Sequence, residues 1–507
     1  MKPDSGSTVS IWMDTFEVPE FKPMDKESVC DVCIIGAGIT GLTAGYMLLK
    51  SGKKVIIVDD GKIGGGESSR TTAHITNVID NTFSEIERLH GADAVKLAAE
   101  SQREAVSIIE GIVKLNNIDC DFAKLKGYLF FAADNKAEFE KEFKTCVDAG
   151  VDVKISEISP LSSFKDDHCL EFPNQAEFHM LKYLSGLAKL ITGMGGIIFS
   201  GTHINKIIDG KPAIAESRDK LKISADDIII ATNSPISDYV SIHTKQTANR
   251  TYVIGINIPR DSVPHGLFWD SEEPYHYVRL YKQQKNDVLI VGGEDHKTGQ
   301  DDNTQIRFNN LIAWATEKFP MSENVAYKWS GQVMEPLDGL SFIGKDPENS
   351  EHVYIATGDS GMGITHATYA AVILDDLING RENKWSELYD PKRITLKTAP
   401  SFIKEGINTA IQYIDIITPP EASKIEEIPA GSGAIMNLGA DKEAVYKDLN
   451  GMIYRFSALC PHLKCVVQWN KTEKTWDCPC HGSRFNAKGK VINGPSLSDL
   501  KPINKLT

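Results

Sequence analysis

The side chains with the clearest chemical potential lie near the end of the chain, in two short segments rich in cysteine and histidine. The first reads CPHLKC over residues 460–465, and the second reads CPCHGS over residues 478–483. A [2Fe–2S] cluster can be held by two thiolates on one iron and two imidazoles on the other, presented by two loops. A Cys-x-His segment and a Cys-x-x-His segment supply such a set, and the predicted ligands are Cys460, His462, Cys478 and His481.

Zinc is the alternative ion, because two cysteines and two histidines can also bind zinc tetrahedrally. Zinc leaves Cys465 and Cys480 without a role. The two segments resemble the cluster-binding loops of Rieske proteins of the respiratory quinol-oxidising type. This resemblance implies a disulfide between Cys465 and Cys480, and a [2Fe–2S] cluster rather than zinc. It also implies that the two histidine ligands lie at an exposed tip, where an outside electron partner would meet them.

A second chemical signature lies near the start of the chain. Three glycines, Gly36, Gly38 and Gly41, form a G-x-G-x-x-G turn between a predicted strand at 31–35 and a predicted helix at 42–50. Such a turn brings a pyrophosphate close to the backbone at the positive end of the helix. A second predicted strand follows and ends at Asp59, whose carboxylate can accept hydrogen bonds from a ribose. The pattern predicts a dinucleotide site.

Five further segments decide which dinucleotide is bound. They are residues 64–74, 228–233, 329–331, 338–344 and 356–366. Together they resemble the D-amino-acid oxidase/glycine oxidase family over about residues 30–390, and the resemblance implies bound FAD. It also implies hydride transfer to the flavin from a C–H next to an amine nitrogen. The remaining FAD-binding residues that it implies are Asp60, Arg70, Thr71, His74, Thr232, Gly358, Gly361, Gly363 and Ile364.

Two of these residues carry more detailed expectations. Some members of the family attach FAD covalently through a histidine, and Arg70 occupies the equivalent place here, so we expect FAD to be bound without a covalent link. The late glycine-rich turn, 358–363, opens a helix whose positive end would face the pyrimidine edge of the flavin. His74 is a weaker candidate for contact with the ring system.

The substrate side is less well marked. Family members that bind amino acids commonly clamp the carboxylate with an arginine from the antiparallel sheet. Arg279, on a predicted strand beside Tyr277, can be such a clamp or an arginine on an exposed strand face. Tyr277 and His179 are further candidate catalytic residues, and His296 is a candidate pocket residue. Each of the two histidines fits a structural histidine as well.

These signatures give the fold class and the domain organisation. We predict an α/β FAD-binding Rossmann-like domain with an antiparallel-sheet substrate domain, followed by a small all-β Rieske domain. The predicted boundaries are an N-terminal arm at 1–28, the FAD-dependent oxidoreductase at 29–390, a linker with a short helix at 391–421 and the Rieske domain at 422–507. Within the oxidoreductase, the FAD-binding parts are about 29–84, 160–240 and 329–390, and the substrate-domain parts are about 85–159 and 241–328. We expect the helix near 402–414 to hold the modules together.

Composition excludes several other classes of protein. The net charge of −14 argues against a nucleic-acid partner, because neutralising phosphates requires a basic surface. No run of about 18 apolar residues predicts a membrane span. The first residues lack the apolar core of a signal peptide, so we expect a cytoplasmic protein. Cys30 and Cys33 have the spacing of a redox motif but sit in an apolar strand, which favours buried packing thiols.

The leading functional hypothesis is an amine or amino-acid dehydrogenase. A small amine or amino acid would reduce FAD by two electrons, and the cluster would pass them one at a time to an external one-electron acceptor. A cluster would be superfluous in a simple oxidase. One alternative is the reverse flow, in which an external donor feeds the cluster and the flavin reduces a small molecule. The other is a redox sensor.

Overall fold

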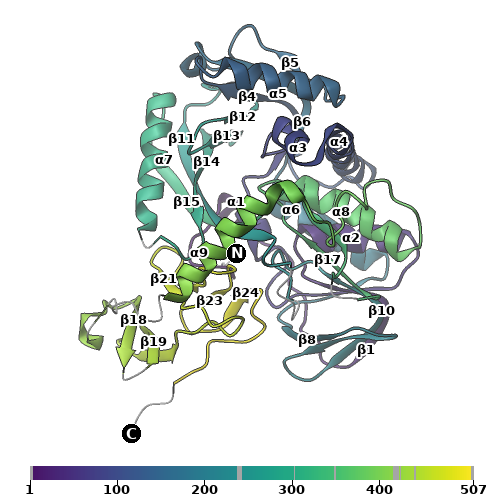
Figure 1. The fold of residues 1–507 in the computed structure, drawn as a ribbon, viewed down its shortest axis with the longest axis vertical. Helices are drawn as coiled ribbons and strands as arrows, with labels where there is room; N and C mark the ends of the chain where they lie inside the picture. Colours follow the sequence, from purple (N-terminus) through teal and green to yellow (C-terminus); the bar gives the residue numbers. More distant parts are fainter. Residues whose placement is uncertain are drawn as a thin grey trace.

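The computed structural model describes residues 4–236, 242–301, 303–347, 350–414, 422, 424–438 and 441–503. Two large sheets form the body of the protein, and a small domain of short strands packs at one side (Figure 1). We refer to residues 28–378 as the two-sheet unit and to the described residues from 424 onward as the C-terminal domain. Among the described helices, none is both long and apolar enough to cross a bilayer.

The first sheet has the strand order β16-β17-β10-β1-β2-β7, and β9 and β8 extend it through β10. Its strands are β1 (Ser28–Ile35), β2 (Val55–Val58), β7 (Ile197–Phe199), β8 (Ile204–Ile208), β9 (Ala213–Ser217), β10 (Lys222–Ile230), β16 (Phe342–Lys345) and β17 (Val353–Thr357). The strands from β17 to β7 are parallel, and β16 is antiparallel to β17. The central strands are almost continuously apolar, as expected of a parallel sheet that is covered on both faces. Cys30 and Cys33 lie buried in β1 as free thiols, which confirms their prediction as packing residues.

Three helices pack beside this sheet: α2 (Ile39–Lys50), α6 (Met180–Gly193) and α8 (Gly363–Ile378). Helix α2 packs against both α8 and α6 (Figure 1). The strand–turn–helix–strand unit predicted around the first glycine turn is therefore present as β1, α2 and β2, with β1 and β2 parallel and adjacent.

The second sheet has the order β15-β11-β14-β13-β12-β4-β6-β3, with β5 beside β6. Its strands are β3 (His74–Ile75), β4 (Ala123–Phe131), β5 (Lys154–Ile155), β6 (His168–Glu177), β11 (Gln246–Ile258), β12 (Leu267–Asp270), β13 (His276–Tyr281), β14 (Asp287–Lys297) and β15 (Val325–Pro336). The accompanying helices are α3 (Phe83–His90), α4 (Ala92–Leu115), α5 (Lys136–Asp148) and α7 (Thr304–Lys318). The sheet is antiparallel except where β12 pairs with β4. The predicted antiparallel substrate sheet is thus confirmed.

The C-terminal domain contains two small antiparallel sheets, which confirms the predicted all-β module. Their strands are β18 (Ser432–Leu438), β19 (Asp441–Lys447), β20 (Ile453–Ser457), β21 (Gln468–Asn470), β22 (Thr475–Asp477), β23 (Arg484–Asn486) and β24 (Val491–Asn493). Trp469, Trp476 and Phe485 are buried in its core. The large aromatic side chains supply the apolar area that such a small domain needs.

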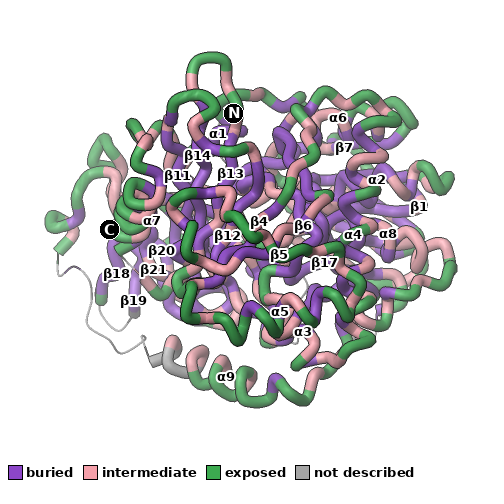
Figure 2. Tube along the Cα trace, turned by 90° about the horizontal axis from the view of Figure 1, so that it is seen from above, coloured by how far each residue is buried: buried purple, intermediate pink, exposed green. Residues whose placement is uncertain are grey.

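Two helices lie outside these layers, α1 (Ile11–Thr15) and α9 (Ala399–Ile414), and the described short turns of 3₁₀-helix are η1 (Glu67–Arg70), η2 (Ser162–Phe164), η3 (Leu396–Thr398) and η5 (Ile425–Glu427). Helix α9 lies at the margin of the molecule with an exposed surface (Figure 2). An ion pair between Glu405 and Lys297 joins α9 to the two-sheet unit. Helix α1 is buried instead, and its Trp12 donates a hydrogen bond to the carbonyl of Thr71 at 2.6 Å.

The C-terminal domain meets the rest of the chain at a buried carboxylate, Glu473, in the turn between β21 and β22. Glu473 lies 3.1 Å from Arg70 of η1 and 3.8 Å from Arg250 of β11. The N-terminal arm joins them, because the backbone N–H groups of Ser7 and Thr8 donate to the same carboxylate at 2.9 and 3.1 Å. Burial alone would raise the pKa of Glu473, but its arginine neighbours lower it to about 2. The carboxylate of Glu473 therefore connects the C-terminal domain, the two-sheet unit and the N-terminal arm.

Replacing Glu473 with Gln should destabilise the folded protein strongly. The change leaves buried guanidinium groups without their counter-charge, and breaking a buried ion pair in this way costs about 3–5 kcal/mol. Thermal unfolding followed by circular dichroism measures the loss. The matched control is Glu85→Gln, which removes an exposed pair with Arg88 and should leave the midpoint nearly unchanged. Equal midpoints for wild type and Glu473→Gln would show that this carboxylate does not hold the parts together.

Candidate active site and metal centre

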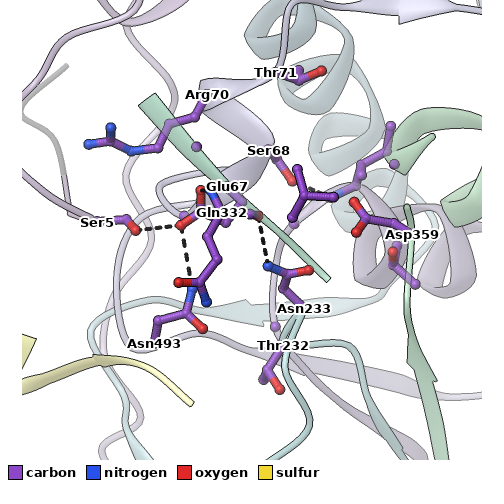
Figure 3. A pocket seen from close by; sticks show the side chains of 18 of the residues that line it. Ser5, Glu67, Ser68, Arg70, Thr71, Thr232, Asn233, Gln332, Asp359 and Asn493 are labelled. Atoms are coloured by element: carbon purple, nitrogen blue, oxygen red, sulfur yellow. Dashed lines mark hydrogen bonds between the residues drawn. The ribbon is translucent and has the colours of Figure 1, made fainter. Parts of the chain in front are cut away.

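A cavity of about 770 Å³ opens at the carboxyl ends of the parallel strands. Ligands of open α/β sheets bind at this edge, outside the ends of the strands. The cavity wall also includes residues of the antiparallel sheet, of the N-terminal arm and of the C-terminal domain. Figure 3 shows how Ser5 of the arm, Asn493 of the C-terminal domain and Gln332 of β15 gather around Glu67.

One end of the cavity has the geometry of a nucleotide site. Gly36 has a φ of 109°, and a side chain there would collide with the backbone of Ala231. A Cβ on Gly41 would strike the carbonyl of Gly36, so the first turn of α2 packs directly on the loop. Gly38 caps α2 without a side-chain hydrogen bond, while Ser68 accepts one from the N–H of Ile39 at 3.0 Å. The arrangement leaves room for a pyrophosphate at the positive end of the helix.

Asp59 completes this end. Its carboxylate accepts hydrogen bonds from the N–H groups of Ala37 at 2.6 Å and Gly61 at 2.8 Å. Burial, reinforced by the charge of Asp60, raises the pKa of Asp59 to about 7. Asp60 lines the same wall and lies 3.1 Å from His203. Hydroxyl groups of a ribose would satisfy a carboxylate held in this way.

The opposite end, which we call the ring end, is formed by residues 71–80, by strands of the antiparallel sheet and by the start of α8. His74 and His366 both line it, and the Nε2 atom of each is buried without a hydrogen-bond partner among the described residues. Burial lowers the pKa of each imidazole to about 3, so both are neutral at physiological pH. Unpartnered polar atoms in this wall fit a polar heterocycle such as the flavin ring.

Most residues predicted to bind FAD lie in the cavity wall. They are Gly36, Gly38, Asp59, Asp60, Arg70, Thr71, His74, Thr232, Gly361, Gly363 and Ile364. Gly41 and Gly358 are not among the described lining residues, because they act behind the wall. Gly41 lets the helix approach the loop, and Gly358 (φ 77°) turns the backbone beside Pro336.

Arg70 contacts both the cavity and the C-terminal domain. It lines the cavity, yet its guanidinium donates to the carbonyl of Ser330 at 2.8 Å and pairs with Glu473. The residue expected from the sequence to take the place of a flavin-linking histidine therefore also contacts the C-terminal domain. The carbonyl of Arg70 accepts a hydrogen bond from Trp329 at 2.7 Å, which fixes the backbone at this point.

The structure corrects the prediction that Arg279 clamps a substrate carboxylate. Arg279 is 1% exposed and pairs with Glu177 at 2.9 Å. Its remaining donors bond to the carbonyls of Thr72 and Ala73, and it is not among the described residues that line the cavity. The alternation in its strand placed it correctly on the sheet, but the guanidinium is already fully engaged by internal acceptors.

The candidate histidines are structural as well. His179 caps α6 by accepting from the N–H of Lys182, contacts Thr15, and does not belong to the described cavity wall, so the prediction of a catalytic role is corrected. His296 is hydrogen-bonded to Tyr252 at 2.9 Å and likewise lies outside the described wall. Tyr277 does line the cavity, and its hydroxyl lies 3.0 Å from that of Thr251.

Sequence reasoning missed a group of carboxylic acids at the ring end: Asp80, Asp295, Glu335 and Asp359. Burial, together with the charges of neighbouring carboxylates, raises the pKa of Asp80 to about 7 and that of Asp295 to about 8. Among the described lining residues of the ring end there is no lysine or arginine. The four acids are far apart in the sequence, so no local motif could have identified them.

The four predicted cluster ligands converge at one end of the C-terminal domain. Cys460 and Cys478 are buried, free thiols. The imidazole centroids of His462 and His481 lie 5.1 Å apart, and one buried nitrogen of each lacks a hydrogen-bond partner among the described residues. Burial lowers the pKa of each histidine to about 4, which leaves the neutral, ligating form. The donor set and its unpartnered atoms fit a [2Fe–2S] cluster.

The loops that carry these ligands are tied together. A disulfide joins Cys465 to Cys480, as the resemblance to Rieske proteins implied, with the Cα atoms 6.4 Å apart. These two sulfur atoms and that of Cys478 lie within 4.8 Å of one another, but only Cys478 keeps a free thiol. The hydroxyl of Ser483 accepts a hydrogen bond from the N–H of Ser496, which secures the loop that follows β24.

The orientation of the C-terminal domain differs from the expectation of an exposed tip. His481 is only 7% exposed, and both ligand histidines face His243 of the two-sheet unit, with centroid distances of 5.3 Å from His462 and 6.3 Å from His481. The carbonyl of Gly482 accepts a hydrogen bond from Gln332 at 3.0 Å. The tip is therefore turned inward, toward the cavity wall.

Comparisons with known proteins agree with this geometry. Residues 31–377 match the family model of the FAD dependent oxidoreductases (DAO), and residues 419–504 match that of the Rieske [2Fe-2S] domain. A putative Rieske 2Fe-2S iron-sulfur protein of Bacillus subtilis, YhfW, is 29% identical over 97% of both chains. Gamma-glutamylputrescine oxidoreductase of Escherichia coli is 23% identical over 71% of this chain and 86% of its own length.

Solved structures bear out the fold. Glycine oxidase from Geobacillus kaustophilus superposes with a TM-score of 0.62 at 18% identity, covering 72% of this chain and all of its own. The two cofactor sites predicted from the sequence, for FAD and for a [2Fe–2S] cluster, both correspond to matched domains. The chain thus belongs to the DAO family of FAD-dependent oxidoreductases and carries a Rieske [2Fe–2S] domain after its oxidoreductase domain.

Proposed function

We propose that this protein oxidises a small amine at the flavin and delivers the electrons through its own Rieske cluster to an external one-electron acceptor. FAD supplies hydride acceptance, and the cluster supplies transfer of single electrons. The amine would lose two electrons and two protons and become an imine, and the electrons would leave singly. The observation that carries the proposal is the inward-facing tip, where His462 and His481 meet the two-sheet unit.

Contacts along the cavity support an internal route. Glu67, in the cavity wall, accepts a hydrogen bond from the N–H of Gln332 at 2.7 Å and pairs with Arg484 of the Rieske domain at 3.2 Å. Asn493 of the same domain lines the cavity and donates to Glu67. The side chain of Gln332 in turn donates to the carbonyl of Gly482, between the cluster ligands and β23. A short chain of packed residues thus links the flavin site with the cluster site.

The acids of the ring end favour a cationic substrate. Asp80 lies beside Gly361 at the start of α8, and Asp295 has a buried oxygen that lacks a hydrogen-bond partner among the described residues. Burial is the main cause of their raised pKa values, and repulsion between neighbouring carboxylates of the cavity wall adds to it. An ammonium group would relieve this repulsion, whereas a substrate carboxylate would add to it. Tyr275 and Tyr277 in the same wall offer aromatic faces suited to a cation.

The names of two relatives are consistent with amine chemistry. One relative is a gamma-glutamylputrescine oxidoreductase, and a structural neighbour is a glycine oxidase. The ring end of this chain lacks an available arginine among its described lining residues, since Arg279 is held by Glu177. We therefore favour amines without a carboxylate next to the reacting carbon.

The internal route predicts how the holoprotein responds to an amine without oxygen. Anaerobic addition of n-butylamine or diaminobutane should bleach the flavin absorbance and then generate the electron paramagnetic resonance signal of the reduced cluster. His481→Ala should lose the cluster, keep FAD and its bleaching, and lose rapid reduction of cytochrome c. His352→Ala is the matched control, because this histidine directly precedes β17, pairs with Asp227 of β10 and is not among the described lining residues of the cavity. Reduction of the flavin by a chemically reduced cluster, with no amine bleaching the flavin, would support the reverse flow instead.

The acidic ring end predicts a pH dependence of substrate binding. Asp295 has a pKa raised to about 8, so it is neutral below that pH and charged above it. The KM for a cationic amine should therefore fall as pH rises from 6 to 8, while the amine itself stays protonated up to about pH 10. Asp295→Asn should raise KM about 10-fold at pH 8 and flatten this fall.

Steady-state reduction of cytochrome c at a series of amine concentrations measures that KM. Asp261→Asn, which alters an aspartate paired with Lys282, is the control and should behave as wild type. An unchanged KM in Asp295→Asn, or equal preference for glycine and n-butylamine, would contradict a cation site.

A further inference from the structure

Three imidazoles meet where the Rieske domain docks on the two-sheet unit. His462 and His481 come from the two cluster-binding loops, and His243 precedes β11. The rings of His243 and His462 are nearly perpendicular, at 83°, with centroids 5.3 Å apart. His243 is 2% exposed, so its ring is enclosed by protein on the side away from the ligands.

The nitrogens of this group are unsatisfied. Both ring nitrogens of His243, Nε2 of His462 and Nδ1 of His481 are buried and lack a hydrogen-bond partner in the part of the chain that the structure describes. Leaving a buried polar atom unpaired costs about 1–3 kcal/mol. A histidine that binds a metal through one nitrogen keeps the other as an N–H donor, and that donor usually has a protein acceptor. A neutral imidazole offers one acceptor nitrogen and one donor.

We propose that His243 accepts a hydrogen bond from the free N–H of His462 when the cluster is bound. This bond would connect the cluster ligand directly to the two-sheet unit. His243 is then a positioning residue: it fixes the orientation of the ligand imidazole and the seat of the tip. The inference rests on the proposed internal electron route, but the contact itself can be tested without turnover.

Contacts of β11 and β15 with the loop at Gly482 fix the position of His243 relative to the ligand histidines. A few residues along, Ala248 of β11 packs so closely on Gly482 that a Cβ on this glycine would collide with it. Gly482 has a φ of 75°, so the loop needs glycine for its backbone as well as for this close approach. Gln332 fixes the same loop from β15 through the carbonyl of Gly482. The distance between His243 and the ligand histidines is therefore set by backbone packing on both sides.

A hydrogen bond of this kind changes the cluster as well as the docking. An acceptor on the ligand N–H makes the imidazole a stronger electron donor to the iron, which stabilises the oxidised cluster. Its removal should raise the midpoint potential. Loss of the contact should also slow electron transfer from flavin to cluster, because the ligand ring loses its connection to the two-sheet unit.

The test compares His243→Leu with His243→Gln in the full-length holoprotein. Leu fills the space without an acceptor, while Gln restores one. For His243→Leu we expect full iron content, an altered electron paramagnetic resonance spectrum of the dithionite-reduced cluster, a raised midpoint potential and about 10-fold slower cluster reduction by the reduced flavin. His243→Gln should recover part of each change. His168→Leu is the matched control, since that imidazole stacks on Phe139 far from the Rieske domain and has an unpartnered nitrogen of its own.

The outcomes separate the two proposals. An unchanged spectrum and potential in both His243 variants would overturn the hydrogen bond. A second outcome combines an altered spectrum in His243→Leu with no electron transfer from flavin to cluster in the wild type. This outcome would support the hydrogen bond and contradict the internal electron route. If His243→Leu fails to fold, His243→Ala, which also removes the acceptor, takes its place in the comparison with His243→Gln and the wild type.

Discussion

Glu473 is a buried carboxylate, and two of its three arginine neighbours lie far from it in the sequence. Arg70 belongs to the turn after the nucleotide-binding strands, Arg250 to the antiparallel sheet and Arg484 to the Rieske domain itself. Buried ions are tolerated only when their partners and hydrogen bonds are correctly placed. The Rieske domain can therefore dock in very few orientations, and the one adopted turns the cluster ligands inward.

The same constraint shapes the active site. Glu67 lies close to this junction and joins Ser5 of the arm, Gln332 of the antiparallel sheet and Asn493 of the Rieske domain (Figure 3). The cavity that receives the flavin is thus completed by the Rieske domain, which contributes Asn493 and its neighbours to the wall. In this protein the second cofactor domain is part of the wall around the first.

The two cofactor sites could be predicted because the signature residues of each lie close together in the sequence. The spacing of glycines around Gly38 and the placement of Asp59 specify a backbone shape that few other residue types permit, and the ligands from Cys460 to His481 lie within two short loops. Long-range packing was not predictable. The pattern around Arg279 predicted its strand but not its ion pair with Glu177, which lies in β6, three strands away in the same sheet. Likewise, nothing in the sequence near His462 indicates that the tip will face His243 of the two-sheet unit.

The N-terminal arm has a consequence for how the chain is made. Thr8 and Ser7 bond to Glu473 across 465 and 466 residues. At roughly 5–20 residues per second, a ribosome needs on the order of 20–90 seconds to cover that interval. During this time Arg70 and Arg250 have been synthesised without the carboxylate that balances them. Until the Rieske domain has been synthesised, the N-terminal arm therefore lacks its hydrogen bonds to Glu473, and the cavity lacks the part of its wall that this domain supplies.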